Sequence, residues 1–201
     1  MKQKIQIRCK NNKKSQKVEI GSTLFDVFSS FDLKMTHGPV SARVNNKVEG
    51  MHYRVYNSKD VEFLDMNSAS GSRAYTRTLF FVLCKAVQDI YPNTDVVIDI
   101  PVSNGFYVDI RLGRPVVDED VNILRRRMQE IIDSKMPIRR FTVPTEEAIA
   151  LFQEKGDVEK VKLLRTSGSI YTTYYKIGEY VDYYYGTLLT NTSQLYLFGL
   201  E

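Results

Sequence analysis

The chain has 201 residues, of which 43% are hydrophobic and 26% charged, the balance of an ordinary globular protein that buries a core. It contains no apolar run near the ~18 residues that cross a bilayer, and its lysine-rich start lacks the apolar region of a signal peptide. Only two cysteines are present, which argues against a disulfide framework and favours a reducing, cytoplasmic setting without membrane contact.

Positive charge gathers in the first third of the chain. Residues 1–65 hold 12 basic and 7 acidic side chains, whereas the remainder is nearly balanced, so this region supplies the net charge of +4. Lys10, Lys13 and Lys14 form the centre of a basic patch that would attract RNA phosphates or an acidic protein surface. The favoured alternative is a solvated edge strand protected by lysines, because no aromatic side chains are interleaved with them.

The first 66 residues are predicted to form a small mixed domain. Residues 4–10 and 16–20 alternate apolar and polar side chains on either side of an Asn-Asn-Lys-Lys turn, which is typical of a hairpin. Ser22 is expected to cap a short amphipathic helix over 24–28, followed by a strand that runs into the turn at Asn45 and Asn46 and by a closing strand over 59–66. A hairpin, a helix and two further strands describe a β-grasp, the ubiquitin-like half-barrel.

The small polar residues 67–72 are predicted to be a linker, and residues 73–201 a second domain. Helices are expected from about Tyr75 to Ile90, over 118–135, over 145–155 with Thr145 as cap, and from 157 onward. Strands are expected over 95–112, around a Ser-Asn-Gly turn, and in the tyrosine-rich stretch 169–189. The fold class is therefore α+β.

The helix that begins near Tyr75 is predicted to have two different faces. At ~100° per residue, one stripe faces the core, and it consists of Leu79, Leu83, Ala86, Val87 and Ile90. The opposite face carries Arg73, Arg77, Phe81 and Cys84. A phenylalanine and two arginines that face away from the main core indicate that the second face is covered by another element or opens into a cleft.

Several common chemistries lack their residues. No Gly-Lys dipeptide occurs, so a P-loop is absent from this chain, and two isolated histidines without a CxxC pair do not make a zinc site. We therefore expect no catalytic residue, no metal and no cofactor in the chain itself. Asp109 or Asp182, together with Tyr107, could serve a hydrolase, but nothing in the sequence positions a nucleophile, so this hypothesis ranks lowest.

Each of the two predicted domains resembles a known domain family. The stretches "IGSTLFDVFSSF", "ARVNNKVEG" and "DVEFLDMNS" resemble a TGS domain, the β-grasp module of threonyl-tRNA synthetases and some GTPases. The stretches "LCKAVQDIYPNTDVVIDIPVSNGFYVDI", "VVDEDVNILRRRMQEII", "PTEEAIALFQEKGDVEKVKLL" and "GEYVDYYYG" resemble the second additional, or editing, domain of threonyl- and alanyl-tRNA synthetases. The resemblance implies a TGS-like domain over 1–66 and an editing-like domain over 73–201.

The resemblance also implies that the editing site is degenerate. Editing domains carry an H-x-x-x-H pair on the first helix and a C-x-x-x-H pair after the "EYVD" strand, and these positions hold Arg77, Phe81, Tyr184 and Leu188 here. Phenylalanine and leucine have no lone pair, and arginine does not lose its proton to act as a base. Hydrolysis of misacylated tRNA by the usual route is therefore not expected.

A TGS domain followed by such a degenerate domain also resembles the N-terminal half of bacterial nucleoside kinases related to uridine kinase. This resemblance implies that the chain is part of a longer ATP-dependent transferase, with ATP and Mg²⁺ bound by a downstream kinase domain. In that hypothesis the chain is a non-catalytic regulatory region that binds a nucleoside or nucleotide in a remnant cleft, whose lining would be Arg73, Arg77, Phe81, Asn104, Tyr107, Asp182, Tyr184 and Leu188.

Two other interpretations stay open. Phe81, Tyr184 and Leu188 could simply fill the old pocket, with Arg77 stacked on Tyr184, and this filled pocket is favoured because burying each large side chain contributes ~1.5–3 kcal/mol. Alternatively, the chain is an RNA- or tRNA-binding module derived from threonyl-tRNA synthetase, without editing activity, in which Lys10, Lys13 and Lys14 contact phosphates.

Overall fold

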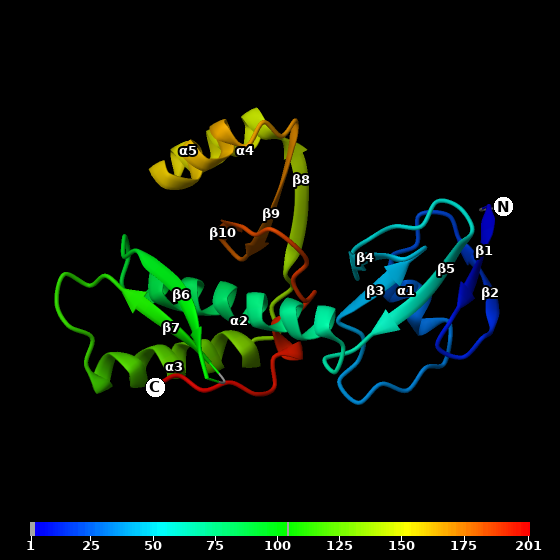
Figure 1. Ribbon diagram of the computed structural model, residues 1–201, viewed down its shortest axis with the longest axis horizontal. Helices are drawn as coiled ribbons and strands as arrows, with labels where there is room; N and C mark the ends of the chain where they lie inside the picture. Colours follow the sequence, from blue (N-terminus) through cyan, green and yellow to red (C-terminus); the bar gives the residue numbers. More distant parts are fainter. Residues whose placement is uncertain (1–2, 104) are drawn as a thin grey trace.

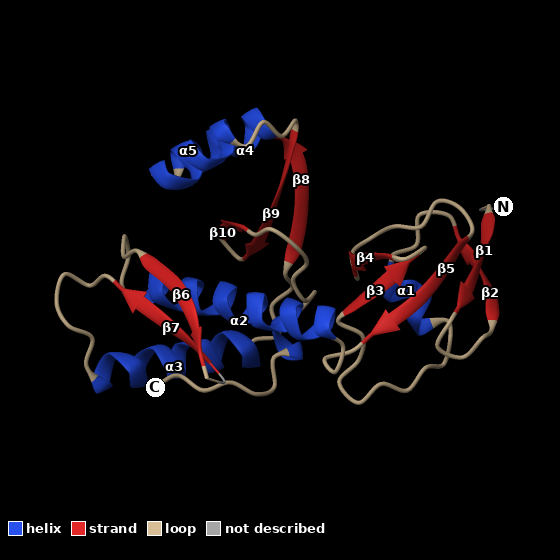
Figure 2. Cartoon of the chain, in the orientation of Figure 1, coloured by secondary structure: helices blue, strands red, loops and turns tan. Residues whose placement is uncertain are grey.

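A computed structural model of the protein describes residues 3–103 and 105–201. Figures 1 and 2 show a compact β-rich unit formed by the N-terminal residues and, beside it, a larger unit built around two long helices. The described part of the chain combines three sheets with several helices, which confirms the α+β class. None of its helices is both long and apolar enough to span a bilayer.

The N-terminal unit is a five-stranded sheet in the order β2-β1-β5-β3-β4. Its strands are β1 (Lys4–Cys9), β2 (Ser15–Glu19), β3 (Ser41–Val44), β4 (Lys47–Gly50) and β5 (Lys59–Leu64), and the helix α1 (Leu24–Ser29) follows the first hairpin. The central pair β1 and β5 is parallel, whereas the other pairs are antiparallel. This arrangement is the β-grasp that the sequence predicts.

Local details of this unit follow from residue chemistry. The two-residue turn between β3 and β4 uses Asn45 and Asn46 at φ of 45° and 72°, a left-handed conformation that asparagine tolerates better than most residues. The expected cap Ser22 is wrong by one position, because the Thr23 hydroxyl accepts the Asp26 amide while the Asp26 carboxylate accepts the Thr23 amide. The sequence analysis also missed β4 as a separate strand.

The predicted linker over residues 67–72 is largely wrong. Helix α2 spans Ala69–Ile90, so only Asn67 and Ser68 precede it, and the Ser68 side chain caps the helix by accepting the Gly71 amide at 3.0 Å. A Cβ built on Gly71 would lie 1.9 Å from the backbone oxygen of Asp65. The small residues in this stretch therefore allow the helix to approach β5 closely.

The second unit contains the remaining elements. Helix α3 (Asp118–Asp133) lies beside α2, and the hairpin of β6 (Val96–Val102) and β7 (Gly105–Ile110) packs near the same helices (Figure 1). A separate antiparallel sheet has the order β10-β9-β8, with β8 (Arg139–Pro144), β9 (Tyr171–Ile177) and β10 (Tyr180–Tyr183). Helices α4 (Thr145–Glu154) and α5 (Val158–Thr166) join β8 to β9, and a short 3-10 turn, η1, covers Thr192–Gln194.

Two corrections concern this unit. Strand β8 was not predicted, although it pairs with β9 along its whole length. Thr145 is the first residue of α4 rather than a side-chain cap, and its hydroxyl instead donates to the Ser169 carbonyl and contacts the Thr172 hydroxyl.

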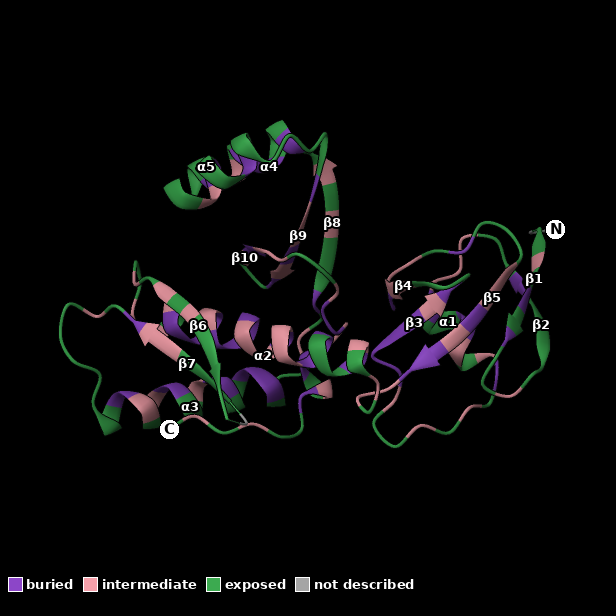
Figure 3. Cartoon of the chain, viewed as in Figure 1, coloured by how far each residue is buried: buried purple, intermediate pink, exposed green. Residues whose placement is uncertain are grey.

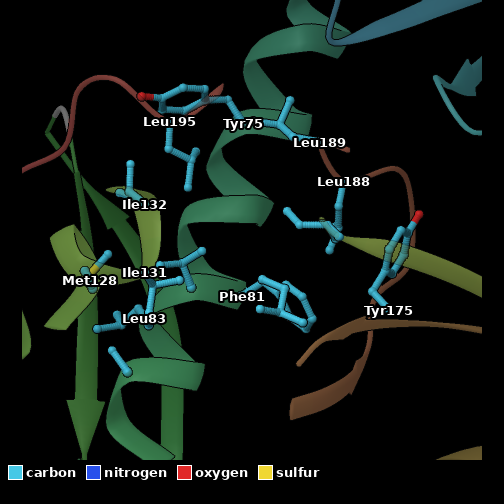
Figure 4. Packing of buried hydrophobic residues seen from close by; sticks show 14 of the residues in the cluster. Tyr75, Phe81, Leu83, Met128, Ile131, Ile132, Tyr175, Leu188, Leu189 and Leu195 are labelled. Atoms are coloured by element: carbon cyan, nitrogen blue, oxygen red, sulfur yellow. The ribbon is translucent and has the colours of Figure 1, made fainter. Parts of the chain in front are cut away.

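Both faces of α2 are covered. One face packs against α3 through buried side chains that include Leu83, Met128 and Ile131, and the other carries Phe81 toward β9 and the segment after β10 (Figures 3 and 4). Val40 of the β-grasp belongs to the same hydrophobic cluster, so the two units share part of one core. The β-grasp has its own core, centred on Ile7, Leu24 and Phe63.

Candidate functional site

The four residues that the resemblance aligns with the editing positions lie between α2 and the chain around β10. Helix α2 supplies Arg77 and Phe81, four residues apart and therefore on one face, and the segment after β10 supplies Tyr184 and Leu188. The structure brings Phe81 and Tyr184 together, with ring centroids 5.6 Å apart at 82°. The sequence positions that the resemblance aligned with the editing residues therefore converge in space.

Hydrophobic side chains fill this site. Phe81 is 0% exposed and Leu188 is 1% exposed, and both belong to the main core cluster. The Phe81 ring also contacts Tyr180 at a centroid distance of 5.2 Å, and Figure 4 shows Phe81, Leu188 and Tyr175 beside one another. The geometry supports the filled-pocket interpretation, because the aligned phenylalanine and leucine lie within packed core rather than at an open surface.

Arg77 lies beside the filled region, against the backbone of the turn at Gly186. A Cβ built on Gly186, at φ 117°, would lie 2.8 Å from the Arg77 guanidinium carbon. The guanidinium thus lies against the turn after β10, where a side chain at position 186 would displace it. The expected stack of Arg77 on Tyr184 is replaced by this contact with the chain.

Asp182 anchors the polar border of the site. It is 6% exposed, and its carboxylate accepts from the Tyr180 hydroxyl at 2.9 Å, from the Tyr183 amide at 2.7 Å and from Lys160 at 2.9 Å. Lys160 on α5 also pairs with Asp157 at 2.7 Å. Burial lowers the pKa of Lys160, but the two carboxylates raise it by more, so the pKa lies above its usual value and the lysine remains charged.

Cys84 completes the cluster, one helical turn after Phe81. Burial raises its pKa to about 12, with the Asp182 charge adding to the effect, so the thiol is protonated at neutral pH and is a poor nucleophile. Burial likewise raises the pKa of Tyr184 far above its usual value. Neither group supplies a base or a thiolate, and Asp182 is already committed to three hydrogen-bonding partners.

Other predicted site residues lie elsewhere. Arg73 is exposed on the first turns of α2 and contacts Ser70 at 3.3 Å, and Tyr107 is 60% exposed on β7. Asp109, proposed for the hydrolase alternative, forms an ion pair with Arg111 on the β6–β7 hairpin, apart from Asp182. Asn104 lies outside the described residues. The structure therefore does not assemble the full predicted lining into one cleft.

Sequence reasoning missed Lys160 and Tyr180 as members of this cluster. Cys84 was placed on the correct helix face but was not included in the site. Cys84 follows Phe81 by three residues, which places the two side chains next to each other on a helix, and this spacing could have identified it. The contact between Lys160 and Asp182 could not be predicted from a local pattern, because the two residues belong to different elements.

Known proteins resemble this chain over nearly its whole length. No family model matches it. It is 30% identical to a threonine–tRNA ligase of Acetivibrio thermocellus over 181 residues, which is 90% of this chain and 28% of that protein. Threonine–tRNA ligases of Azobacteroides pseudotrichonymphae and Clostridium kluyveri are 27% and 28% identical, over 92% and 94% of this chain and 29% and 30% of their own lengths.

These comparisons support the broader resemblance. The chain is similar to threonine–tRNA ligases over about nine-tenths of its length, and it spans less than a third of each of these relatives. None of the three is named a kinase, so they favour the interpretation derived from threonyl-tRNA synthetase over the regulatory region of a nucleoside kinase. The kinase domain, its ATP and its Mg²⁺ stay predictions from the resemblance alone.

Proposed function

We propose that this chain is an RNA-binding module, derived from the same source as part of threonine–tRNA ligases, that does not carry out the editing reaction. The observation that carries the proposal is similarity to proteins named for a tRNA substrate over 90% of the chain, together with a site filled by Phe81 and Leu188. The binding function is retained in this proposal and the hydrolytic function is lost.

The lysines at the first hairpin provide the phosphate-binding surface. Lys10, Lys13 and Lys14 are all exposed at the turn between β1 and β2, and none of them forms an ion pair within the described part of the chain. The turn is held by a hydrogen bond from the Cys9 amide to the Lys14 carbonyl at 2.8 Å. The Lys10 ammonium also donates to the Asn46 side chain at 3.4 Å. A fixed turn with three exposed ammonium groups suits the contact with a phosphate backbone.

Part of the other positive charge is neutralised locally. On the sheet, Arg43 pairs with Glu62 and Lys47 with Glu49. On α3, Arg127 pairs with Asp89 and Glu130. The hairpin turn is thus a favoured place for an added polyanion, since its charge is not already satisfied by carboxylates.

The test is a tRNA-binding titration over a series of salt concentrations. The triple variant Lys10→Gln, Lys13→Gln, Lys14→Gln is expected to bind more weakly, and its plot of log K against log salt should flatten by about 0.9 for each lysine that contacts a duplex phosphate. A variant with unchanged slope and affinity, or a wild-type chain that does not retard tRNA at low salt, would refute the proposal.

A charge-matched control comes from the helical pair at the far end of the second unit. Lys155, Lys162 and Arg165 are exposed on or beside α4 and α5, and Figure 1 places these helices away from the β-grasp. Replacing these three with glutamine removes the same net charge. The proposal predicts a clearly smaller change in slope than the hairpin variant gives, which separates local contact from general attraction.

The absence of editing has its own test. Incubation of the purified chain with threonine-specific tRNA mischarged with serine is expected to release the amino acid no faster than buffer does, because the site holds a protonated thiol, a neutral tyrosine and two hydrocarbon side chains. The measurement is a time course of aminoacyl-tRNA with the chain in excess. Accelerated release would show that other residues perform the reaction.

A further inference from the structure

A cavity of about 620 Å³ lies between the β-grasp and the second unit. One wall comes from α1 and the chain near it, including Phe25 and Phe28, and from His37 and His52. The opposite wall comes from the segment around η1, including Asn191 and Ser193. This volume falls in the range of sites for small organic ligands, which occur preferentially between domains.

The polar wall is held rigidly. The Asn191 side chain accepts the Ser193 amide at 2.9 Å and donates to the Lys135 carbonyl at 2.9 Å. The Gln194 side chain accepts the Thr190 amide at 3.0 Å and donates across the interface to the Pro39 carbonyl at 3.2 Å. A wall fixed by such bonds loses little conformational freedom when it binds a ligand.

An aromatic column leads to the cavity. The Tyr75 hydroxyl accepts the Leu197 amide at 2.8 Å and so fixes the C-terminal segment, and its ring meets Tyr196 edge to face at 5.5 Å. Tyr196 stacks in turn on His37, with centroids 3.8 Å apart at 14°. His37 also lines the cavity, so the row of stacked rings ends at the cavity wall, where Tyr196 supports the His37 ring.

The lining is uncharged and largely apolar, with a few polar side chains on one wall. Among the described residues that line the cavity, none is a lysine, arginine, aspartate or glutamate. His52 contributes a buried Nε2 without a hydrogen-bond partner within the described structure, while the Ile138 backbone bonds to its ring. Because this nitrogen is buried, it does not face the cavity, and the polar group that remains for a ligand on the opposite wall is the Ser193 hydroxyl. A neutral wall of this kind gives no attraction for a phosphate or a metal ion.

We propose that the interdomain cavity binds a neutral planar ring with hydrogen-bonding edges, the chemistry of a nucleobase. The ring stacks against His37, which Tyr196 supports, and contacts Phe25, while its polar edge meets Ser193. Histidine and phenylalanine are both used to stack unpaired bases. The base comes either from a free nucleoside or from an unstacked position of RNA, and only the second source rests on the proposed function.

The experiment uses saturation-transfer NMR on the full chain with the common nucleosides at millimolar concentration, and with ribose as a probe that lacks the base. Base protons are expected to receive saturation and ribose protons alone are not. His37→Ala should weaken nucleoside binding about tenfold, the effect of losing one stacking contact, and His37→Phe should restore most of it. Tyr56→Ala, at an aromatic residue 64% exposed outside this lining, should change nothing.

A single-stranded oligonucleotide and its duplex distinguish the two sources. If RNA supplies the base, the single strand binds more tightly than the nucleoside, and His37→Ala weakens it. If a free nucleoside is the ligand, the single strand gains nothing over the nucleoside. The hairpin lysine variant should leave nucleoside binding unchanged, so failure of RNA binding does not affect this outcome. The absence of base saturation, or binding that His37→Ala does not alter, overturns the proposal.

Discussion

The filled site at Phe81 and the interdomain cavity differ in how completely side chains fill the space between neighbouring elements. At the first, aromatic and aliphatic side chains from α2 and the segment after β10 pack until Phe81 and Leu188 are fully enclosed. At the second, uncharged side chains, both apolar and polar, border a volume of about 620 Å³. The comparison teaches that hydrocarbon side chains from two elements close the space between them into core, while binding capacity is to be sought where packing is incomplete.

Among the substitutions that test this comparison, Phe81→Ala is expected to lower the free energy of unfolding most. Phe81→Ala removes a fully buried ring and leaves a cavity between α2 and β10, so the free energy of unfolding should fall by ~3–5 kcal/mol in a urea titration. Tyr185→Ala is the control, because this neighbour of Tyr184 is 87% exposed and should change stability by no more than ~0.5 kcal/mol. A loss at Phe81 as small as that of the control would show that the site is not packed core.

A smaller effect is expected at His52 beside the cavity. Burial lowers the pKa of this imidazole and the nearby Arg140 lowers it further, against the opposing effect of a hydrogen bond that the imidazole donates to the Ile138 backbone. The unfolded chain therefore takes up a proton below about pH 6.5 that the folded chain resists, and folded stability is lost as pH falls through this window. The slope from one such proton is at most ~1.4 kcal/mol per pH unit.

The measurement is urea unfolding of the wild type and of His52→Gln between neutral pH and pH 5. The glutamine variant should lose that part of the pH dependence, whereas His37→Gln should retain it because His52 is still present. Identical pH profiles for the wild type and His52→Gln would mean that the buried imidazole does not couple protonation to folding, and that the wall of the cavity is more hydrated than the structure indicates.

Much of the fold could be predicted from local patterns. Alternation identified β1 and β2, and the 3.6-residue period identified the two faces of α2, because both patterns reflect which side chains leave water. The linker over 67–72 could not be predicted correctly in this way. Serine, alanine and glycine are common in flexible segments, and only the close approach of Gly71 to Asp65 shows why they are needed in a helix here.

The candidate site was partly predictable. Family spacing identified Arg77, Phe81, Tyr184 and Leu188, and the structure places Phe81 against Tyr184 as expected for one site. It gave no indication that Tyr107 stands exposed on a different hairpin or that Lys160 reaches Asp182. Such contacts join elements that are distant in sequence, and no local period records them.

The amino-acid sequence by itself determined that Phe81 and Leu188 offer neither a ligand nor a base, because no arrangement of the chain gives phenylalanine or leucine a lone pair or a removable proton. It also determined the alternation and periodicity from which the β-grasp and the long helices form. Only the tertiary structure decided that Phe81 and Leu188 are enclosed and that a neutral cavity opens between the two units. Enclosure and cavity volume depend on how elements pack across long sequence distances, and the free energy of that packing belongs to the assembled fold.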